Sequence, residues 1–140
     1  MGRILAIDYG KKRVGLAVSD PQKIIAGKLD TVATQTIWNF LQEYFQKEEV
    51  DEVVVGYPRK LNNTASEAVV YINPFLKKFK MNYPDLKLEL VDERFTSRMA
   101  SMAMLEGGMK KKDRRNKEIV DAISATIILQ SYMEQKRNKF

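Results

Sequence analysis

The chain contains no cysteine and no histidine among its 140 residues. These absences exclude disulfide scaffolds, zinc sites built from Cys and His, thiol nucleophiles, and catalytic triads or general bases that use an imidazole. Any catalytic chemistry must therefore come from carboxylates, hydroxyls, lysine or arginine. Any bound metal must be a hard ion held by oxygen, which points to magnesium or manganese.

Long hydrophobic runs are missing as well. No segment approaches the roughly 20 apolar residues that a membrane span needs. The apolar run at the start, Ile4 to Ile7, is cut off by Asp8 and follows one basic residue, so we expect no secretory signal. We expect a cytoplasmic protein with no membrane partner, and the length favours one domain over residues 1–140.

The charge is unbalanced, with 24 Lys and Arg against 18 Asp and Glu and a net charge of +6. A basic chain suits a polyanionic partner such as nucleic acid, because Lys and Arg release counterions from phosphates when they bind. The alternative is a basic surface that only keeps the protein soluble.

Short apolar runs that end at turn signals predict strands, and apolar residues at i, i+3 and i+4 predict helices. The expected strands are 3–9, 13–19, 24–32, 50–55 and 86–91. The expected helices include 37–45 after an N-cap at Thr34 or Thr36, 64–82 with a kink or break at Pro74, 96–106 after a loop, and 116–135. An antiparallel three-strand meander followed by alternating helices and strands predicts an α/β fold, with one mixed five-stranded sheet flanked by helices.

Asp8 is an acid where the hydrophobic pattern expects an apolar residue. It ends the first strand and by alternation shares a face with Ile4 and Ala6. A carboxylate among apolar neighbours is costly unless it is hydrogen-bonded, paired or bound to a metal. The alternative is an Asx-turn into Gly10.

Three further acidic residues stand out. Asp92 and Glu93 end the last strand, where the alternative is a helix-entry acid or a surface ion pair with Arg94. Asp121 lies in the otherwise apolar last helix, near an end where the helix dipole favours an anion, and a capping or dipole role is the alternative. If the first and last strands are parallel neighbours, Asp8, Glu93 and Asp121 meet at one edge of the sheet.

Converging carboxylates would repel one another unless a divalent cation lies between them. Two magnesium ions about 3.5 to 4 Å apart can activate a water on one side of a phosphodiester and stabilise the leaving oxygen on the other. This chemistry needs neither His nor Cys.

Four short motifs in order cover the chain from Arg3 to about Tyr132: Ile7-Asp8-Tyr9-Gly10 with Lys12-Arg13-Val14-Gly15, Val54-Val55-Gly56-Tyr57-Pro58, Asp92-Glu93-Arg94-Phe95-Thr96, and Val120-Asp121-Ala122-Ile123-Ser124-Ala125. Together they resemble the YqgF family, whose members are described as Holliday junction resolvases and as pre-16S rRNA nucleases. One departure is visible, because Arg59 to Thr64 replaces a turn in which many relatives carry a glycine.

The resemblance implies a ribonuclease H-like fold, a site for Mg²⁺ or Mn²⁺, and hydrolysis of nucleic acid phosphodiesters. In this family the activity is most often associated with maturation of the 5′ end of the 16S rRNA precursor. By position, the catalytic and metal-binding acids are Asp8, Glu93 and Asp121. Asp92 is an additional or substitute ligand, and alternation does not settle which of Asp92 and Glu93 faces the site.

Basic residues near these motifs are candidates for phosphate contact. They are Arg13, Arg59, Lys60, Arg94, Lys110, Lys111, Lys112, Arg114 and Arg115, with Lys117 at the end of the last run. The alternative for that last run is a solvated loop. Tyr9 and Tyr57 can stack on bases, or pack on their protein neighbours.

The first hypothesis is therefore a metal-dependent nuclease acting on an RNA precursor, with a DNA four-way junction as the alternative substrate. A junction resolvase needs two sites and hence a dimer, whereas an RNA trimmer can act as a monomer. A second hypothesis is a non-catalytic nucleic-acid-binding module that assists ribosome assembly. A third, an actin-like or sugar-kinase ATPase, needs two such domains, and 140 residues provide one.

Overall fold

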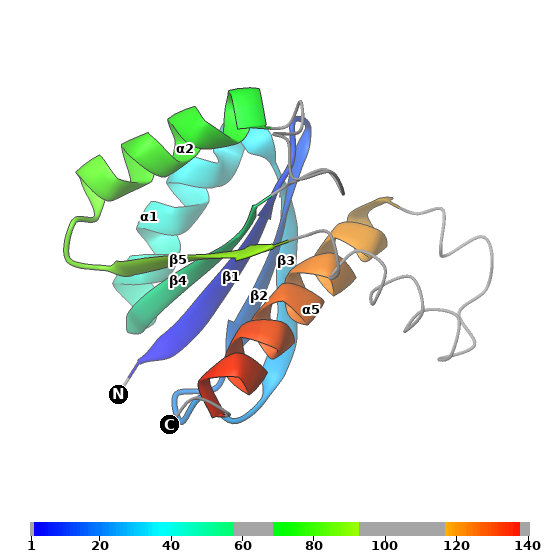
Figure 1. The fold of residues 1–140 in the computed structure, drawn as a ribbon. Helices are drawn as coiled ribbons and strands as arrows, with labels where there is room; N and C mark the ends of the chain where they lie inside the picture. The colour runs from blue at the N-terminus through cyan, green and yellow to red at the C-terminus, as the bar shows by residue number, and fades with distance from the viewer. Residues whose placement is uncertain (1, 58–68, 93–116, 138–140) are drawn as a thin grey trace.

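The structure is a computed structural model that describes residues 2–57, 69–92 and 117–137, with side chains in the last range from residue 123 onward. Its elements follow the predicted order as far as the described residues reach (Figure 1). They are β1 Arg3–Tyr9, β2 Arg13–Ser19, β3 Ala26–Ala33, the short 3-10 helix η1 Thr34–Thr36, α1 Ile37–Lys47, β4 Val50–Tyr57, α2 Val69–Asn82, β5 Lys87–Asp92 and α5 Lys117–Arg137.

The five strands form one mixed sheet in the order β3-β2-β1-β4-β5. β2 is antiparallel to both β1 and β3, whereas β4 is parallel to β1 and β5 is parallel to β4. The predicted fold class is confirmed, and each predicted strand lies within two residues of an observed one. β1 is the central strand, so its carboxyl end is flanked by strands on both sides.

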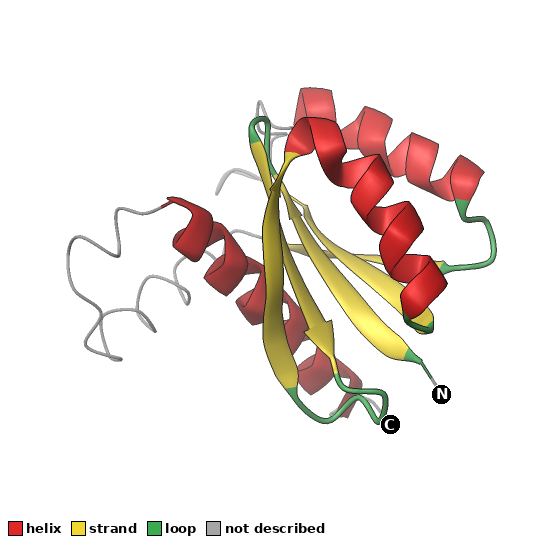
Figure 2. Cartoon of the chain, turned by 180° about the vertical axis from the view of Figure 1, so that it is seen from behind, coloured by secondary structure: helices red, strands yellow, loops and turns green. Residues whose placement is uncertain are grey.

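Helices cover both faces of the sheet (Figures 1 and 2). α1 and α2 lie on one face, where Leu5 and Ile7 of β1 belong to a core cluster that includes Phe75 and Phe79 of α2. α5 crosses the other face, where Ile4 and Ala6 belong to a second cluster. The alternation of β1 between the two clusters follows from the pleat of the strand, and it explains why the run Ile4 to Ile7 is apolar throughout.

A kink or a break is predicted at Pro74, and α2 continues past this residue, so the helix does not break there. Proline removes one backbone donor and crowds the carbonyl four residues earlier, which here belongs to Val70. Pro74 and Val70 are both exposed, so the affected backbone lies on the solvent side of the helix. Meanwhile Phe75 and Phe79 hold the opposite side in the core.

The N-cap prediction is correct in position but not in mechanism. α1 begins after Thr36, yet no side chain caps it. The Thr36 hydroxyl instead donates to the Ala33 carbonyl at 2.8 Å, and the Thr34 hydroxyl donates to the Gly10 carbonyl at 2.7 Å. The predicted start of α2 before residue 69, the helix 96–106 and the loop 110–115 lie outside the described residues.

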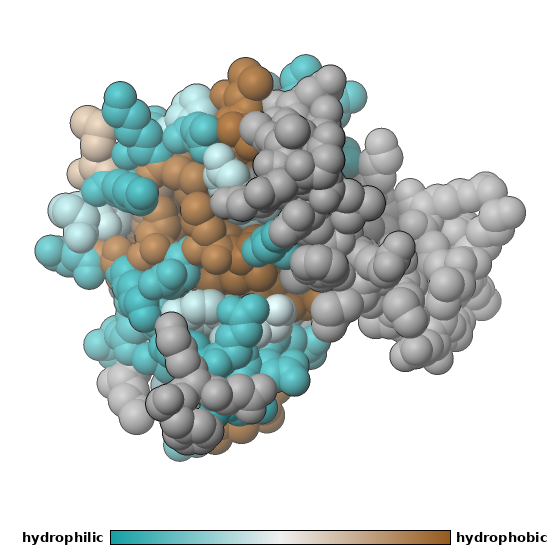
Figure 3. Space-filling view, viewed as in Figure 1, coloured by the Kyte–Doolittle hydropathy of each residue, from teal (hydrophilic) through white to brown (hydrophobic). Residues whose placement is uncertain are grey.

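The edge of the sheet that β5 forms is partly open to solvent. Leu90 of β5 is 49% exposed, and Figure 3 shows apolar surface where Figure 1 places β5 and the adjoining side of α2.

Among the helices of residues 2–57, 69–92 and 117–137, none combines the length and the apolar character needed to span a membrane.

Gly10 lies in the turn between β1 and β2, immediately after Tyr9. A Cβ atom at this position would lie 2.5 Å from the Arg13 carbonyl oxygen, closer than real Cβ contacts come. The turn is also tied to the start of η1, because the Thr34 backbone N–H donates to the Lys12 carbonyl at 3.0 Å. A side chain at position 10 therefore forces backbone to move in a turn that is held from both sides.

We expect Gly10→Ala to lower the free energy of unfolding by about 1–3 kcal/mol, the range of a backbone-disrupting point substitution. Urea denaturation measures the change. Gly27→Ala is the matched control, because a Cβ at Gly27 would meet its nearest neighbour, the Val18 carbonyl oxygen, at an ordinary 4.0 Å. Equal urea midpoints for the two variants would contradict the steric argument.

Candidate functional site

The carboxyl ends of the three parallel strands lie along one edge of the sheet, which we call the carboxyl edge. β1 ends at Tyr9, β4 at Tyr57 and β5 at Asp92. The register aligns them, since Ile7 is the partner of Val55 and Tyr57 is the partner of Asp92. Ligands of open α/β sheets bind outside such an edge. This edge is therefore the candidate site.

Asp8 lies on the α5 face of the carboxyl edge. Its neighbour Ile7 faces α1 and α2, and two residues earlier Ala6 belongs to the α5-facing cluster. The side chain of Asp8 is half-buried, and Gly15 of β2 is its antiparallel partner. The prediction that Asp8 shares a face of the sheet with Ile4 and Ala6 is thus confirmed.

Asp92 lies on the opposite face. It is the register partner of Tyr57, which packs on the α1 and α2 side. The condition under which the three acids were expected to meet, with β5 the direct neighbour of β1, is not fulfilled, because β4 lies between them. Two strand spacings separate Asp8 from Asp92, or about 9–10 Å. β4, the strand that follows α1 in the chain, occupies the position beside β1.

Asp121 lies in the first turns of α5. The orientation of this helix follows from its other end, where the Tyr132 hydroxyl donates to Glu52 near the start of β4. Position 121 is 11 residues before Tyr132, about 16 Å along a helix axis. Glu52 is four residues before Gly56, about 13 Å along a strand. The start of α5 is therefore directed toward the carboxyl edge, as Figure 1 also shows.

The complete acidic set is not within the described residues, since Glu93 and the side chain of Asp121 lie outside them. Among the side chains that the structure does describe, no three of Asp, Glu, His or Cys come together as a metal site. The predicted set of Asp8, Glu93 and Asp121 thus stays a prediction.

Of the basic residues predicted to contact phosphate, Arg13 is described. It is the first residue of β2, half-buried beside the turn that follows Asp8. The others, Arg59, Lys60, Arg94, Lys110, Lys111, Lys112, Arg114 and Arg115, lie outside the described residues. Lys11 and Lys12 are exposed in the same turn. Their position directly after Asp8-Tyr9-Gly10 is the signal in the sequence that they reach the same edge.

Tyr9 and Tyr57 have protein partners. The ring of Tyr9 stacks on Phe75 of α2 with 4.3 Å between centroids, and the Tyr57 hydroxyl donates to the Asn73 side chain at 2.9 Å. Burial and, second, Tyr71 raise the pKa of Tyr9 above its ordinary value. The alternative of packing on neighbours is thus observed for both tyrosines, and they connect the carboxyl edge to α2.

Glu52 is a buried carboxylate that the sequence analysis did not single out. It lies in β4 at the amino end of the parallel strands, with 5% of its surface exposed. Lys136 Nζ lies 2.9 Å from both carboxylate oxygens, the Tyr132 hydroxyl 2.8 Å from one of them, and Lys87 Nζ 3.3 Å. The available signal was the one used for Asp8, an acid inside an apolar strand.

The environment of Glu52 shifts two pKa values. Burial on its own would raise the pKa of Glu52, but the hydrogen bonds from Lys136, Tyr132 and Lys87 outweigh it and lower that pKa. Burial, followed by the hydrogen bond to Glu52, raises the pKa of Tyr132 well above its ordinary value. Glu52 is therefore charged and Tyr132 is neutral at physiological pH.

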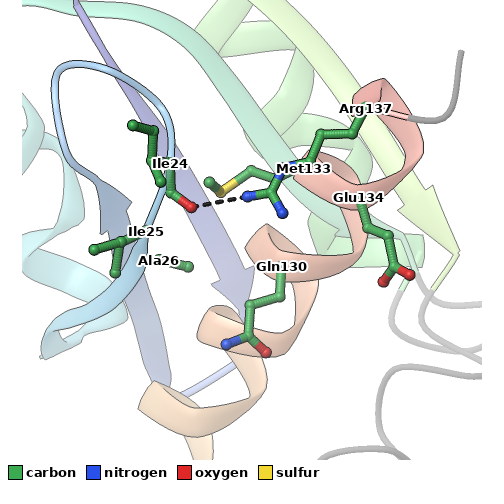
Figure 4. A pocket seen from close by; sticks show the side chains of 7 residues that line it. All are labelled: Ile24, Ile25, Ala26, Gln130, Met133, Glu134 and Arg137. Atoms are coloured by element: carbon green, nitrogen blue, oxygen red, sulfur yellow. Dashed lines mark hydrogen bonds between the residues drawn. The ribbon is translucent and has the colours of Figure 1, made fainter.

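Two cavities lie at the same amino end of the sheet. One, of about 600 Å³, lies between the β2–β3 connection and α5, where Arg137 donates to the Ile24 carbonyl at 2.8 Å (Figure 4). The other, of about 340 Å³, lies beside Lys87 and Tyr132. Neither is lined by Asp8 or Asp92, so these cavities are separate from the candidate site.

Comparison with known proteins adds an independent observation. The model of the family RuvX, described as Holliday junction resolvase, matches residues 2–135. The chain belongs to the RuvX family. This match confirms the resemblance to YqgF that the four motifs indicate.

Relatives match the RuvX chain over nearly its whole length. A protein of Phocaeicola vulgatus named "Putative pre-16S rRNA nuclease" is 55% identical over 98% of this chain and 99% of its own. A protein of the same name from Flavobacterium psychrophilum is 52% identical over 97% of this chain and 99% of its own. The similarity thus extends over nearly the whole length of both chains in each pair.

Solved structures support the fold. RuvC of Thermus thermophilus, in a complex with a Holliday junction substrate, superposes with a TM-score of 0.59 at 15% identity, over 96% of this chain and 97% of that one. A second Thermus thermophilus RuvC structure gives a TM-score of 0.55, also at 15% identity. At this identity the similarity confirms the ribonuclease H-like fold of the RuvX chain.

Proposed function

We propose that this RuvX protein is a divalent-metal-dependent nuclease that hydrolyses nucleic acid phosphodiesters, acting as a single domain in 5′-end processing of the 16S rRNA precursor. The observation that carries the proposal is Asp8, a half-buried carboxylate at the carboxyl end of the central strand of a ribonuclease H-like sheet. Relatives named as pre-16S rRNA nucleases, which align over 98% of the chain, support the substrate class.

The proposed catalytic and metal-binding residues are Asp8, Glu93 and Asp121. The register supports Glu93 over Asp92, because Asp92 lies with Tyr57 on the face opposite to Asp8. The direction of α5 supports Asp121, since the start of this helix is directed toward the carboxyl edge. Position 121 is also one turn before Ala125, which is completely buried against the sheet, and residues four apart share a helix face.

The donor set fits Mg²⁺ or Mn²⁺. Carboxylate oxygens are hard ligands, and a chain without His or Cys offers no softer side chain that would select zinc. When bound, such an ion supplies charge stabilisation at phosphorus and lowers the pKa of a coordinated water. The chain's own contribution is to hold Asp8 at a fixed point on the central strand, between two paired neighbours.

Basic residues at the carboxyl edge are proposed to bind the phosphate backbone. Arg13, Lys11 and Lys12 follow Asp8 in the β1–β2 turn, and the turn is fixed by its hydrogen bonds to Thr34. Contacts of this kind position the strand without reading its sequence. Arg59, Lys60, Arg94, Lys110, Lys111, Lys112, Arg114 and Arg115 are proposed to extend the same surface.

A second candidate function is resolution of DNA four-way junctions. It is favoured by the description of the RuvX family and by the fold that the chain shares with RuvC. Both substrates present the same phosphates, so the same acids would act in either case. The two functions differ in assembly, because resolution needs two sites and hence a homodimer.

Purified protein should be offered a 5′-extended 16S precursor and a four-way junction, each with Mg²⁺, with Mn²⁺ or with chelator. We expect cleavage of the RNA precursor that depends on the ion, by a protein that sedimentation shows to be a monomer. Cleavage of the junction alone, by a dimer, would favour the second candidate. Binding of either substrate without cleavage under all conditions would refute the nuclease and leave the non-catalytic assembly factor.

A further inference from the structure

Glu52, Tyr132 and Lys136 form a cluster at the amino end of the sheet that has no part in the proposed reaction. Removing the Glu52 carboxylate from water nevertheless costs free energy of desolvation. Glu52 is 5% exposed, and it receives hydrogen bonds from Tyr132 and Lys136, both in the last turns of α5. A buried ion pair is weak evidence for stability, because apolar side chains of similar size often do as well. Its best-attested use is to fix register between packed elements.

The apolar contact of α5 with the sheet is broad. Ile127, Ile128 and Leu129 are three successive residues that are all buried, so the apolar surface of this helix is not confined to one narrow stripe. On the opposing sheet face, the small side chains of Ala6 and Ala17 lie among the larger ones of Ile4, Val54 and Val91. A broad apolar contact of this kind is less specific about register than a hydrogen bond to one buried carboxylate, because the hydrophobic effect is non-directional.

The cluster opposes sliding. The Tyr132 hydroxyl and Lys136 Nζ reach the same carboxylate from successive turns of α5, at 2.8 and 2.9 Å. Movement of the helix by one residue shifts it about 1.5 Å and turns it about 100°, which would break both contacts. Glu52 would keep Lys87 at 3.3 Å and Lys23 at 3.9 Å but lose its shortest hydrogen bonds, which is unfavourable for a buried charge.

We propose that Glu52, Tyr132 and Lys136 set the register of α5 on the sheet and thereby position Asp121 relative to Asp8. The inference rests on the proposed function for its consequence, because Asp121 is a proposed ligand. The helix transmits the constraint as a rod over the 11 residues from Tyr132 back to position 121, about 16 Å. Catalytic groups must be held within about 0.5 Å of productive geometry, so a slip of one residue is enough to disrupt the site. Glu52, Tyr132 and Lys136 are thus positioning residues.

The test replaces the cluster by apolar side chains of similar size, Glu52→Met with Tyr132→Phe and Lys136→Met. The chain has no cysteine, so Gln42→Cys and Gln130→Cys, both exposed and on helices that cover opposite faces, give two unique spin-label sites. Electron-electron distance measurements then report how α5 sits against the rest of the fold. Urea denaturation, Mg²⁺ titration and cleavage kinetics are measured on the same variants without labels.

We expect the triple variant to keep the parent's urea midpoint and to show a broadened distance distribution. The Mg²⁺ concentration for half-maximal cleavage should rise about tenfold, the lower end of the effect of lost supporting residues at metal sites. The kcat should fall while KM for the nucleic acid is unchanged. Lys136→Arg in an otherwise unchanged chain should keep the narrow distribution, because it retains the charge and the donors from which Glu52 accepts hydrogen bonds.

Two further variants keep the test decisive. Tyr132→Phe alone removes one hydrogen bond and should broaden the distribution partly, even if the triple variant fails to fold. Glu48→Gln is the matched control, since it breaks a partly exposed ion pair with Arg3 at 3.2 Å without touching α5. It should leave the distances and the Mg²⁺ response unchanged.

A parent-like narrow distribution in the triple variant and in Tyr132→Phe would overturn the inference. The distances decide this without any reference to activity. If the parent neither cleaves nor binds Mg²⁺, the proposed function fails, while a broadened distribution would still support the role of the cluster in the register of α5.

Discussion

Asp8→Asn is expected to slow metal-dependent cleavage about a hundred- to a thousandfold, because a metal site supplies several kcal/mol of transition-state stabilisation and each 1.36 kcal/mol is a factor of ten. Asparagine keeps the size of the side chain but removes the charge that a divalent ion needs. The fold should persist, since the substitution leaves the pairing of β1 with β2 and β4 in place. Single-turnover cleavage assays measure the loss, and filter binding should show retained affinity for the substrate.

Mg²⁺ binding gives a readout that does not depend on cleavage. An ion at a hundred times its dissociation constant stabilises the folded state by about 2.7 kcal/mol if it binds there alone. We therefore expect Mg²⁺ to raise the melting temperature of the parent and to leave that of Asp8→Asn unchanged.

Asp51→Asn is the matched control for the same chemical change. Asp51 accepts the Gly2 backbone N–H at 2.9 Å and pairs with Lys23 at 3.0 Å, at the other end of the sheet. The Gly2 N–H and Lys23 hold the pKa of Asp51 below its ordinary value, so this residue also works as a charged group. Its cleavage and its Mg²⁺ response should match those of the parent. Equal rates for Asp8→Asn and the parent would refute the proposed site.

The sheet could be predicted from the sequence because its signals are local. Continuous apolar runs with a residue on each face, as in Ile4 to Ile7, require a strand that is covered on both sides, and α5 and α2 provide that cover. Asp8 stood out for the same reason, as the polar residue that ends the run. The order of the strands is not local, so the sequence left the adjacency of β1 and β5 as a condition, and in the structure β4 lies between them.

The pairing of β5 with β4 shows on which face of the sheet Asp92 lies, which alternation along one strand did not. Whether Asp92 shares a face with Asp8 depends on its partner, Tyr57, which the sequence does not name. Glu52 shows a different limit, because its partners Tyr132 and Lys136 are 80 and 84 residues away. A long-range ion cluster has no spacing to recognise, so only the rule about acids in apolar strands could have found it.

Phe75→Ala is expected to have the opposite effect to Asp8→Asn: a large loss in the free energy of unfolding and a small loss in the rate of cleavage. Phe75 is 4% exposed, and its ring lies 4.3 Å from that of Tyr9, 5.1 Å from Trp38 and 6.2 Å from Phe79. Truncation of a buried phenylalanine costs about 3–5 kcal/mol, through lost burial and the cavity that remains. For a domain of this size that loss lowers the melting temperature by about 10 °C or more.

Calorimetry or thermal denaturation by circular dichroism measures this shift. Phe40→Ala is the control, because Phe40 is half-buried and its ring stacks at 5.9 Å on Tyr44, one turn further along the same helix. It should cost less than half as much. Well below the melting temperature, Phe75→Ala should still cleave within about tenfold of the parent, since pairing with β2 and β4 holds Asp8 even without the contact between Tyr9 and α2. A loss of cleavage as deep as that of Asp8→Asn, in a variant still folded at the assay temperature, would show that the contact of Tyr9 with α2 also positions the acid before it.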